Sequence, residues 1–151
     1  MAMGVMGIPR FERFFRSVAE LDVDKDDLKR FNGFVFDQIY DMLIRAEANA
    51  KANLRDTIEP WDLPITKGVQ ERIHEFEKLD DQVEVEPFLE DLVARPQLDV
   101  TLTEDTIARL PYVAGGLSVA LARSFKIIDP KLKNPSSEHW NRVFALFELL
   151  M

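Results

Sequence analysis

A chain of 151 residues with 46% apolar side chains is long enough for one ordinary domain, or for two small halves that share a core. The apolar content argues against a disordered chain. The absence of cysteine excludes disulfides, thiolate metal sites and a cysteine nucleophile. The formal net charge of −8 argues against a general nucleic-acid binder, because such domains are usually basic.

The sequence carries no clear signal for export or membrane insertion. The first seven residues lack a basic segment followed by a long apolar run, so they do not form a good secretory signal. No apolar stretch approaches the ~18 residues that a membrane span requires. We therefore expect a soluble protein of the cytoplasm.

The first half of the chain predicts a short helix, a long helix and a second short helix. Residues 8–20 carry phenylalanines at helical spacing. The aspartate-rich turn at 22–27 supplies capping residues. Residues 26–54 contain no proline and a single glycine, Gly33, and their apolar side chains recur in steps of three and four. Residues 65–79 are expected to form the third helix.

The second half predicts the same order of elements. A short helix is expected at residues 85–94, a long helix at 104–128 and a last helix from 135 to the end of the sequence. Thr101 and Glu104 have the spacing of a capping box at the start of the second long helix.

Two features are expected to interrupt this second long helix. Pro111 has no N–H group, so it should kink the helix or leave a backbone carbonyl without a donor. The pair Gly115-Gly116 follows near the middle of the helix. Paired glycines at such a position more often let another helix pack closely than contact a ligand.

The segment from Arg55 to Asp62 gives the most specific signal. Arg55 and Thr57 are two residues apart, and Asp62 follows the arginine by seven, where the long helix is expected to end. This arrangement resembles the loop after the central helix of the histone fold. Residues 8–63 line up with archaeal histones without a gap, and Arg-Phe-Phe-Arg at 13–16 looks like their first-helix pattern Arg-Ile-Ile-Lys.

The chain is therefore similar to a bacterial histone-fold doublet of the uncharacterised family called DUF1931. The resemblance implies an all-α fold of tandem histone units, residues 1–79 and 80–151. These would pack across their long helices as an intramolecular pseudodimer and form one compact domain. The second half matches in element order and length only, because it has no Arg-x-Thr motif before its last helix.

The resemblance also implies roles for individual residues. Arg55 and Asp62 would form a charge pair that pins the loop, and Thr57 would present its hydroxyl where histones meet DNA phosphate. Maintenance of the fold alone is the alternative role for all three. Positions at which histones carry basic residues hold Asp22 and Asp56 instead, and acidic groups at such positions repel the phosphate backbone.

Some basic side chains remain as candidates for DNA contact. Arg10, Arg13 and Arg16 recur at steps of three on the first expected helix, so they share one face; Arg55 and Thr57 complete the set. A solvated helix face is the alternative interpretation of the three arginines. Two lysines before the last helix would add to them: Lys131 and Lys133.

Other chemistry finds little support. The alternating aspartates at 22–26 resemble the start of an EF-hand loop, but Asp27 stands where glycine is needed and Gly33 where glutamate is needed. His74 and His139 have no ligand-type neighbours at metal-motif spacing. We therefore expect no metal and no cofactor.

The sequence favours a non-enzymatic, histone-like protein that acts as a protein-interaction or assembly module, through another protein or through self-association. The alternative is a weak, non-specific DNA-binding protein of the nucleoid, and an uncharacterised enzyme is a distant third. Acidic residues concentrate at 75–91. They form either a solvated surface or a site for a basic partner. The identity of the partner and the oligomeric state stay open.

Overall fold

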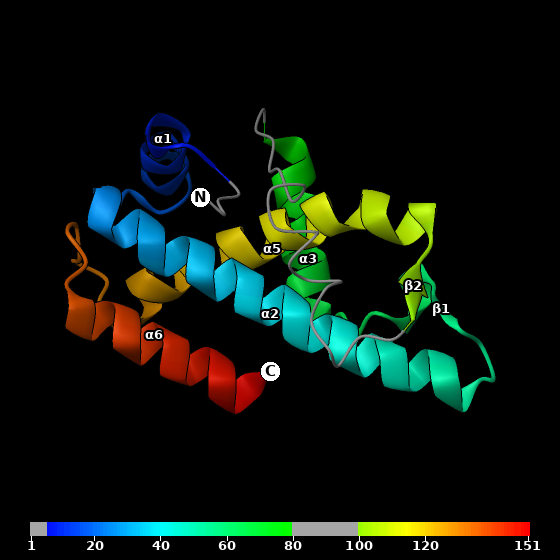
Figure 1. Ribbon diagram of the computed structural model, residues 1–151. Helices are drawn as coiled ribbons and strands as arrows, with labels where there is room; N and C mark the ends of the chain where they lie inside the picture. Colours follow the sequence, from blue (N-terminus) through cyan, green and yellow to red (C-terminus); the bar gives the residue numbers. More distant parts are fainter. Residues whose placement is uncertain (1–5, 80–99) are drawn as a thin grey trace.

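The computed structural model describes residues 6–79 and 100–151, and within them the chain is mainly helical (Figure 1). The described helices are α1 (Ile8–Ala19), α2 (Lys25–Ala52), α3 (Lys67–Lys78), α5 (Glu104–Ile128) and α6 (Ser137–Leu150). Two short strands and a 3₁₀ turn accompany them: β1 (Thr57–Ile58), β2 (Thr101–Leu102) and Pro60–Asp62. The expected helical class is confirmed in this coarse form, although the all-α prediction missed the strands. The short helix expected at 85–94 lies outside the described residues.

Helix α2 is the longest element, with 28 residues, and it spans roughly 40 Å. Asp24 caps its start, because the Asp24 carboxylate accepts hydrogen bonds from the backbone N–H groups of Asp26 and Asp27 at 2.9 and 3.0 Å. The Asp27 carboxylate accepts in return from the N–H of Asp24 at 3.1 Å. This reciprocal capping box satisfies donors that have no partner inside the helix.

Helix α5 differs from the sequence prediction in two ways. It continues without interruption through Pro111 and the glycine pair, so the expected interruption is wrong, while the kink or free carbonyl expected from Pro111 stays a prediction. Its cap is Thr103, whose Oγ1 accepts from the N–H of Thr106 at 3.3 Å, and the capping box expected from Thr101 is also wrong. Thr101 instead lies in β2, where its backbone pairs with β1.

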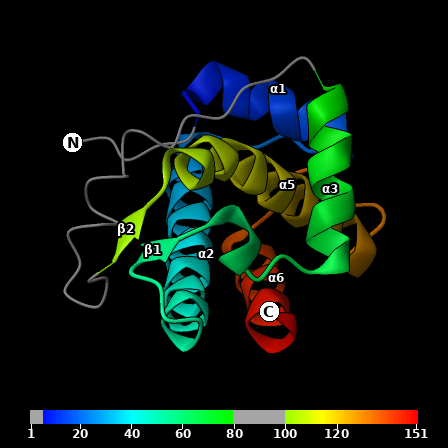
Figure 2. The ribbon, with the colours of Figure 1, turned by 90° about the vertical axis from the view of Figure 1, so that its right-hand side faces the viewer.

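Close packing of α3 on α5 explains the two glycines (Figure 2). A Cβ atom on Gly115 would overlap the ring of Phe76, and one on Gly116 would lie 2.5 Å from Cγ1 of Ile73. The prediction that the pair allows close helix packing is therefore confirmed.

Aromatic side chains join four helices in one core. The ring of Phe15 on α1 lies 5.7 Å from that of Phe31 on α2, 6.5 Å from Phe125 on α5 and 6.1 Å from Trp140 on α6. All four side chains are completely buried. The two halves of the sequence therefore share a single hydrophobic interior.

Backbone contacts tie the two halves together at both ends of α2. Past its C-terminal end, β1 pairs in parallel with β2, where the N–H of Thr103 donates to the carbonyl of Ile58 at 3.2 Å (Figure 2). Before its N-terminal end, the N–H of Asp22 donates to the carbonyl of Lys133 at 2.7 Å. Each contact joins a loop of the first half to a loop of the second.

Candidate functional site

Arg55 and Asp62 form a two-pronged ion pair just after α2. Nη1 of Arg55 donates to Oδ2 of Asp62 at 2.6 Å, and Nη2 donates to Oδ1 at 2.7 Å. The Asp62 side chain is 2% exposed and that of Arg55 is 27% exposed. A planar guanidinium matches a carboxylate in this geometry, so the pair fixes orientation as well as distance.

Further hydrogen bonds attach the 3₁₀ turn to its surroundings. Oδ2 of Asp62 accepts from the N–H of Glu59 at 2.8 Å, and the Asp62 carbonyl accepts from Nδ2 of Asn49 on α2 at 2.8 Å. The hydrogen bonds from Arg55, together with the Glu59 N–H, hold the pKa of the Asp62 carboxyl below its ordinary value. The same pairing raises the pKa of Arg55. The arginine and the aspartate are therefore both charged at neutral pH.

The chain reaches this geometry through an unusual turn. Leu54 has a φ of 60°, the left-handed conformation that residues other than glycine seldom adopt, and its side chain is 96% exposed. The N–H of Arg55 then donates to the carbonyl of Ala50 at 2.9 Å. The turn ends α2 and directs the arginine back toward the loop that it holds.

Thr57 and Trp61 complete this end of the molecule. The carbonyl of Thr57 accepts from Nη1 of Arg55 at 3.2 Å, so the backbone of Thr57 belongs to the clamp. Trp61 is 74% exposed and its ring centre lies 5.9 Å from the Arg55 guanidinium carbon. A polar hollow of about 510 Å³ lies beside them, lined also by Asn49. Trp61 was not predicted from the sequence, because one aromatic residue in a loop carries no periodic signal of exposure.

The expected DNA-contact residues fall into two groups. Arg10, Arg13 and Arg16 lie on α1, near the beginning of α2, whereas Arg55 and Thr57 lie past its other end (Figure 1). The long helix separates the two groups, so they do not form one continuous surface.

Asp22 and Asp56, the two acidic residues expected to disfavour DNA binding, lie in different loops. Asp22 meets one of the arginines, since Nε of Arg16 lies 3.4 Å from Oδ1 of Asp22, with both side chains exposed. Asp56 is exposed beside β1. At both positions an exposed carboxylate lies near the candidate cations.

Neither histidine occupies a metal-type site. Nδ1 of His139 accepts from the N–H of Ser136 at 3.0 Å, which makes it part of the cap of α6. His74 is exposed and lies 3.5 Å from Glu77 on the same helix. Across residues 6–79 and 100–151, no three histidine or carboxylate side chains gather as metal ligands. The described helices also include none that is long and apolar enough to cross a membrane.

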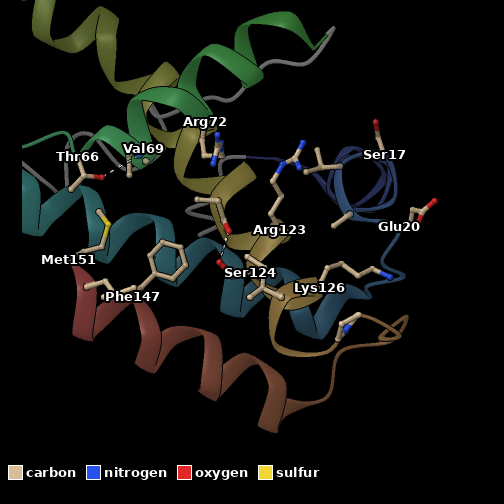
Figure 3. Close-up of a pocket in the computed structure, with 17 residues that line it drawn as sticks. Ser17, Glu20, Thr66, Val69, Arg72, Arg123, Ser124, Lys126, Phe147 and Met151 are labelled. Atoms are coloured by element: carbon tan, nitrogen blue, oxygen red, sulfur yellow. Dashed lines mark hydrogen bonds between the residues drawn. The ribbon is translucent and has the colours of Figure 1, made fainter.

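An open groove of about 890 Å³ runs between α1, α3, α5 and the end of α6 (Figure 3). Nε of Arg72 lies 2.9 Å from Oε2 of Glu75, and Nε of Arg123 lies 3.2 Å from the same oxygen. Nζ of Lys126 donates to the carbonyl of Leu132 at 2.6 Å. The cations of the groove thus already have protein partners. No local pattern in the sequence indicates this groove, because its residues come from four separate segments.

Comparison with known proteins places the chain in a family. Residues 11–148 match the model described as a domain of unknown function, DUF1931. The chain belongs to the DUF1931 family. It is 27% identical over 132 residues to an uncharacterized protein of Aquifex aeolicus (strain VF5), a match that covers 87% of this chain and 77% of that protein.

Two crystal structures resemble the DUF1931 chain along nearly its whole length. One, from Thermus thermophilus, shares 49% identity at a TM-score of 0.90, and the match covers 97% of this chain and 99% of the Thermus chain. The other, from Aquifex aeolicus, shares 24% identity at a TM-score of 0.82, and the match covers 100% of this chain and 99% of the Aquifex chain. The second similarity shows the fold alone.

The outer side of α6 is another notable surface of this DUF1931 chain. Leu149 is 79% exposed and Leu146 is 37% exposed. They border a hollow of about 380 Å³ that is also lined by Ile128, Arg142 and Ala145. The outward direction of Leu146 was not predicted from the sequence.

Proposed function

We propose that this DUF1931 protein is a non-enzymatic, histone-like module that acts by binding another protein surface. The observation that carries the proposal is the apolar outer side of α6, where Leu146 and Leu149 lie beside a hollow formed partly by Ala145. Contiguous apolar surface on an otherwise charged protein marks sites of protein association.

The arrangement of the loops supports the histone-like architecture. A short, a long and a short helix, in that order, form the first half, and its two loops meet two loops of the second half. The first contact between loops is the pairing of β1 with β2, and the second is the hydrogen bond from the N–H of Asp22 to the carbonyl of Lys133. The Arg55–Asp62 pair lies beside the contact between β1 and β2. With both units in one chain, their association is independent of protein concentration.

The ionic groups of the groove support a binding role over a chemical one. A catalytic site needs ionisable groups that converge on a place where substrate can react. In the open groove, Arg72 and Arg123 face Glu75, and Lys126 faces a backbone carbonyl. The Arg123–Glu75 contact joins α5 to α3, the Arg72–Glu75 contact lies within α3, and Lys126 ties α5 to the loop that follows it, so each charged group makes a structural contact.

DNA binding is the second candidate function. It is favoured by Arg13 and Arg16, which are exposed on α1. It is opposed by Asp22, which already lies against Arg16, by the exposed Asp56, and by the net charge of −8. DNA affinity comes largely from neutralised phosphates, so a surface with few free cations binds weakly.

Titration against a generic DNA duplex at ~20 mM and ~150 mM salt separates the two candidates, because phosphate contacts are strongly salt-dependent. We expect no tight binding at either salt concentration. The comparison includes a variant with Arg10, Arg13 and Arg16 changed to glutamine, and a control with Arg45→Gln on α2. One result would favour the nucleoid protein over the interaction module. In that result the chain binds DNA tightly at low salt and loses this binding at the higher salt. The triple variant does not bind, and the control variant still does.

A further inference from the structure

We infer that the outer side of α6 binds a second copy of this chain, with the two α6 helices antiparallel about a two-fold axis near Ala145 and Leu146. The inference rests on the proposed interaction module and names its partner. It follows from the pattern of α6, the shape of its outer side and the charges around it.

Helix α6 is apolar on two sides. One side packs into the core and is buried: Trp140, Val143 and Phe147. The other consists of Ala145, Leu146 and Leu149, which recur at helical spacing and face outward. A surface helix of a monomer usually has one apolar stripe and a polar opposite side. The second stripe on α6 therefore indicates a second packing partner.

The shape of this side is self-complementary. Leu149 projects from it, and the hollow beside it is lined by Ile128, Arg142, Ala145 and Leu146. In an antiparallel pair with its axis between positions 145 and 146, position 149 of one helix lies opposite position 142 of the other. Leu149 of each copy then enters the hollow of the other between Arg142 and Ala145. A two-fold interface of this kind uses the same patch on both copies, and the small side chain of Ala145 permits close helix approach.

The charges also favour a second copy. A net charge of −8 repels copies from one another in general. On α6, however, Arg142 and Glu138 pair with each other at 3.0 Å, so this side contributes no net charge. The antiparallel arrangement also places Arg142 of one copy near the C-terminal end of the other α6. Backbone carbonyls at a helix C-terminus carry partial negative charge, which attracts a cation.

Cysteine crosslinking tests the geometry directly, because the chain contains no cysteine. Ala145→Cys places one thiol near the proposed axis. A disulfide requires Cα atoms within ~7 Å of each other. We expect mild oxidation to convert Ala145→Cys to a covalent dimer, while Ile107→Cys, an exposed site on α5, stays monomeric. Equal rates of crosslinking in the two variants would overturn the inference.

Sedimentation equilibrium tests the energetics with a matched pair of variants. Leu146 is 37% exposed and Ile107 is 38% exposed, so glutamate at either site introduces the same charge at similar exposure. We expect a dimer for the unmodified chain, at least a tenfold weaker dimer for Leu146→Glu, and an unchanged dimer for Ile107→Glu. Far-ultraviolet circular dichroism shows that each variant is folded. An unmodified chain that stays monomeric up to about 100 μM would reject the inference.

The DNA titration keeps the two proposals apart. A monomer that binds no DNA at low salt rejects self-pairing and leaves the interaction module in place. Salt-sensitive DNA binding that is lost with Arg10, Arg13 and Arg16 rejects the module, whatever the oligomeric state.

Discussion

Gly116 on α5 lies directly against the backbone of Ile73 on α3. A Cβ atom on Gly116 would lie 2.5 Å from Cγ1 and 3.0 Å from the backbone nitrogen of Ile73. The side chain of Ile73 is completely buried, and a backbone atom cannot rotate away as the end of a flexible side chain can. The close approach of the two helices at this point therefore depends on the absence of a side chain at Gly116, as it does at Gly115 beside Phe76.

Overpacking by Gly116→Ala should cost about 1–3 kcal/mol, and the better helix propensity of alanine offsets about 1 kcal/mol of that cost. The free energy of unfolding is therefore expected to fall, by up to about 2 kcal/mol. Urea denaturation followed by circular dichroism measures the difference.

Gly33→Ala provides the matched control. Gly33 is also inside a long helix, but it is exposed and nothing lies within 4 Å of the added Cβ position. The substitution should raise the free energy of unfolding by about 0.5–1 kcal/mol through helix propensity alone. If both glycine variants shift stability in the same direction, close packing at Gly116 does not determine the outcome.

Asp62→Ala is expected to lower the free energy of unfolding by about 1–3 kcal/mol, because it removes the acceptor of two Arg55 hydrogen bonds and of the Glu59 N–H. Thermal and urea unfolding measure the loss. Asp56→Ala, at an exposed position in the same loop, should leave stability unchanged. Unchanged stability in Asp62→Ala would show that the clamp does not stabilise the loop.

The same carboxylate predicts a dependence on pH. The hydrogen bonds from Arg55 lower the pKa of Asp62 in the folded state, so the unfolded chain binds its proton more readily. The stabilisation is therefore complete above the ordinary aspartate pKa of about 3.9, and it is lost as the pH falls through the lower folded value. The stability difference between the unmodified chain and Asp62→Asn should shrink as the pH is lowered from about 6 to about 2.

The pKa of Asp27 is shifted in the opposite direction, so Asp27 adds its own pH dependence to the stability. Comparing the unmodified chain with Asp62→Asn removes that contribution. Burial raises the pKa of Asp27, and the folded state binds its proton first as the pH falls. Both chains carry Asp27, so its contribution cancels in the difference. A stability difference that stays constant across this pH range would mean that Asp62 is not held as a carboxylate by Arg55.

Local sequence signals predicted the helical elements well. The apolar stripe of α2 and the aspartates before it placed the longest helix within two residues of its observed ends, Lys25 and Ala52. The resemblance to histones implied a pair between Arg55 and Asp62, and the structure places the two side chains in contact. Such features depend on residues close in sequence, where helical periodicity and capping chemistry operate.

The errors involve contacts between distant segments. β1 and β2 have two residues each, too few for alternation to show, and each forms because the other is present. That pairing takes Thr101 into a strand and leaves Thr103 to cap α5. The outward direction of Leu146 was missed for a similar reason, since a helix that is apolar on both sides gives no local indication of which side is buried.

Thr106, at the start of α5, joins the two halves of the chain through a buried hydrogen bond to Ile58. Its Oγ1 donates to the carbonyl of Ile58 at 2.7 Å, and the side chain is completely inaccessible. Thr106→Val keeps the shape and removes this bond together with the 2.8 Å hydrogen bond between the hydroxyls of Thr106 and Thr103, while the N–H of Thr103 still donates to the Ile58 carbonyl at 3.2 Å. The expected loss is therefore about 1–3 kcal/mol, the net contribution of two hydrogen bonds, without the larger cost of an unsatisfied carbonyl.

Urea denaturation of Thr106→Val beside Thr101→Val separates this bond from the effect of removing a hydroxyl in general. Thr101 is exposed in β2 and pairs with β1 through its backbone, which valine retains. Its substitution should change stability by less than about 0.5 kcal/mol. Equal losses at the two positions would mean that the Thr106 bond adds nothing to the junction. A loss confined to Thr106→Val would show that this side chain helps to join the loop after α2 to the start of α5.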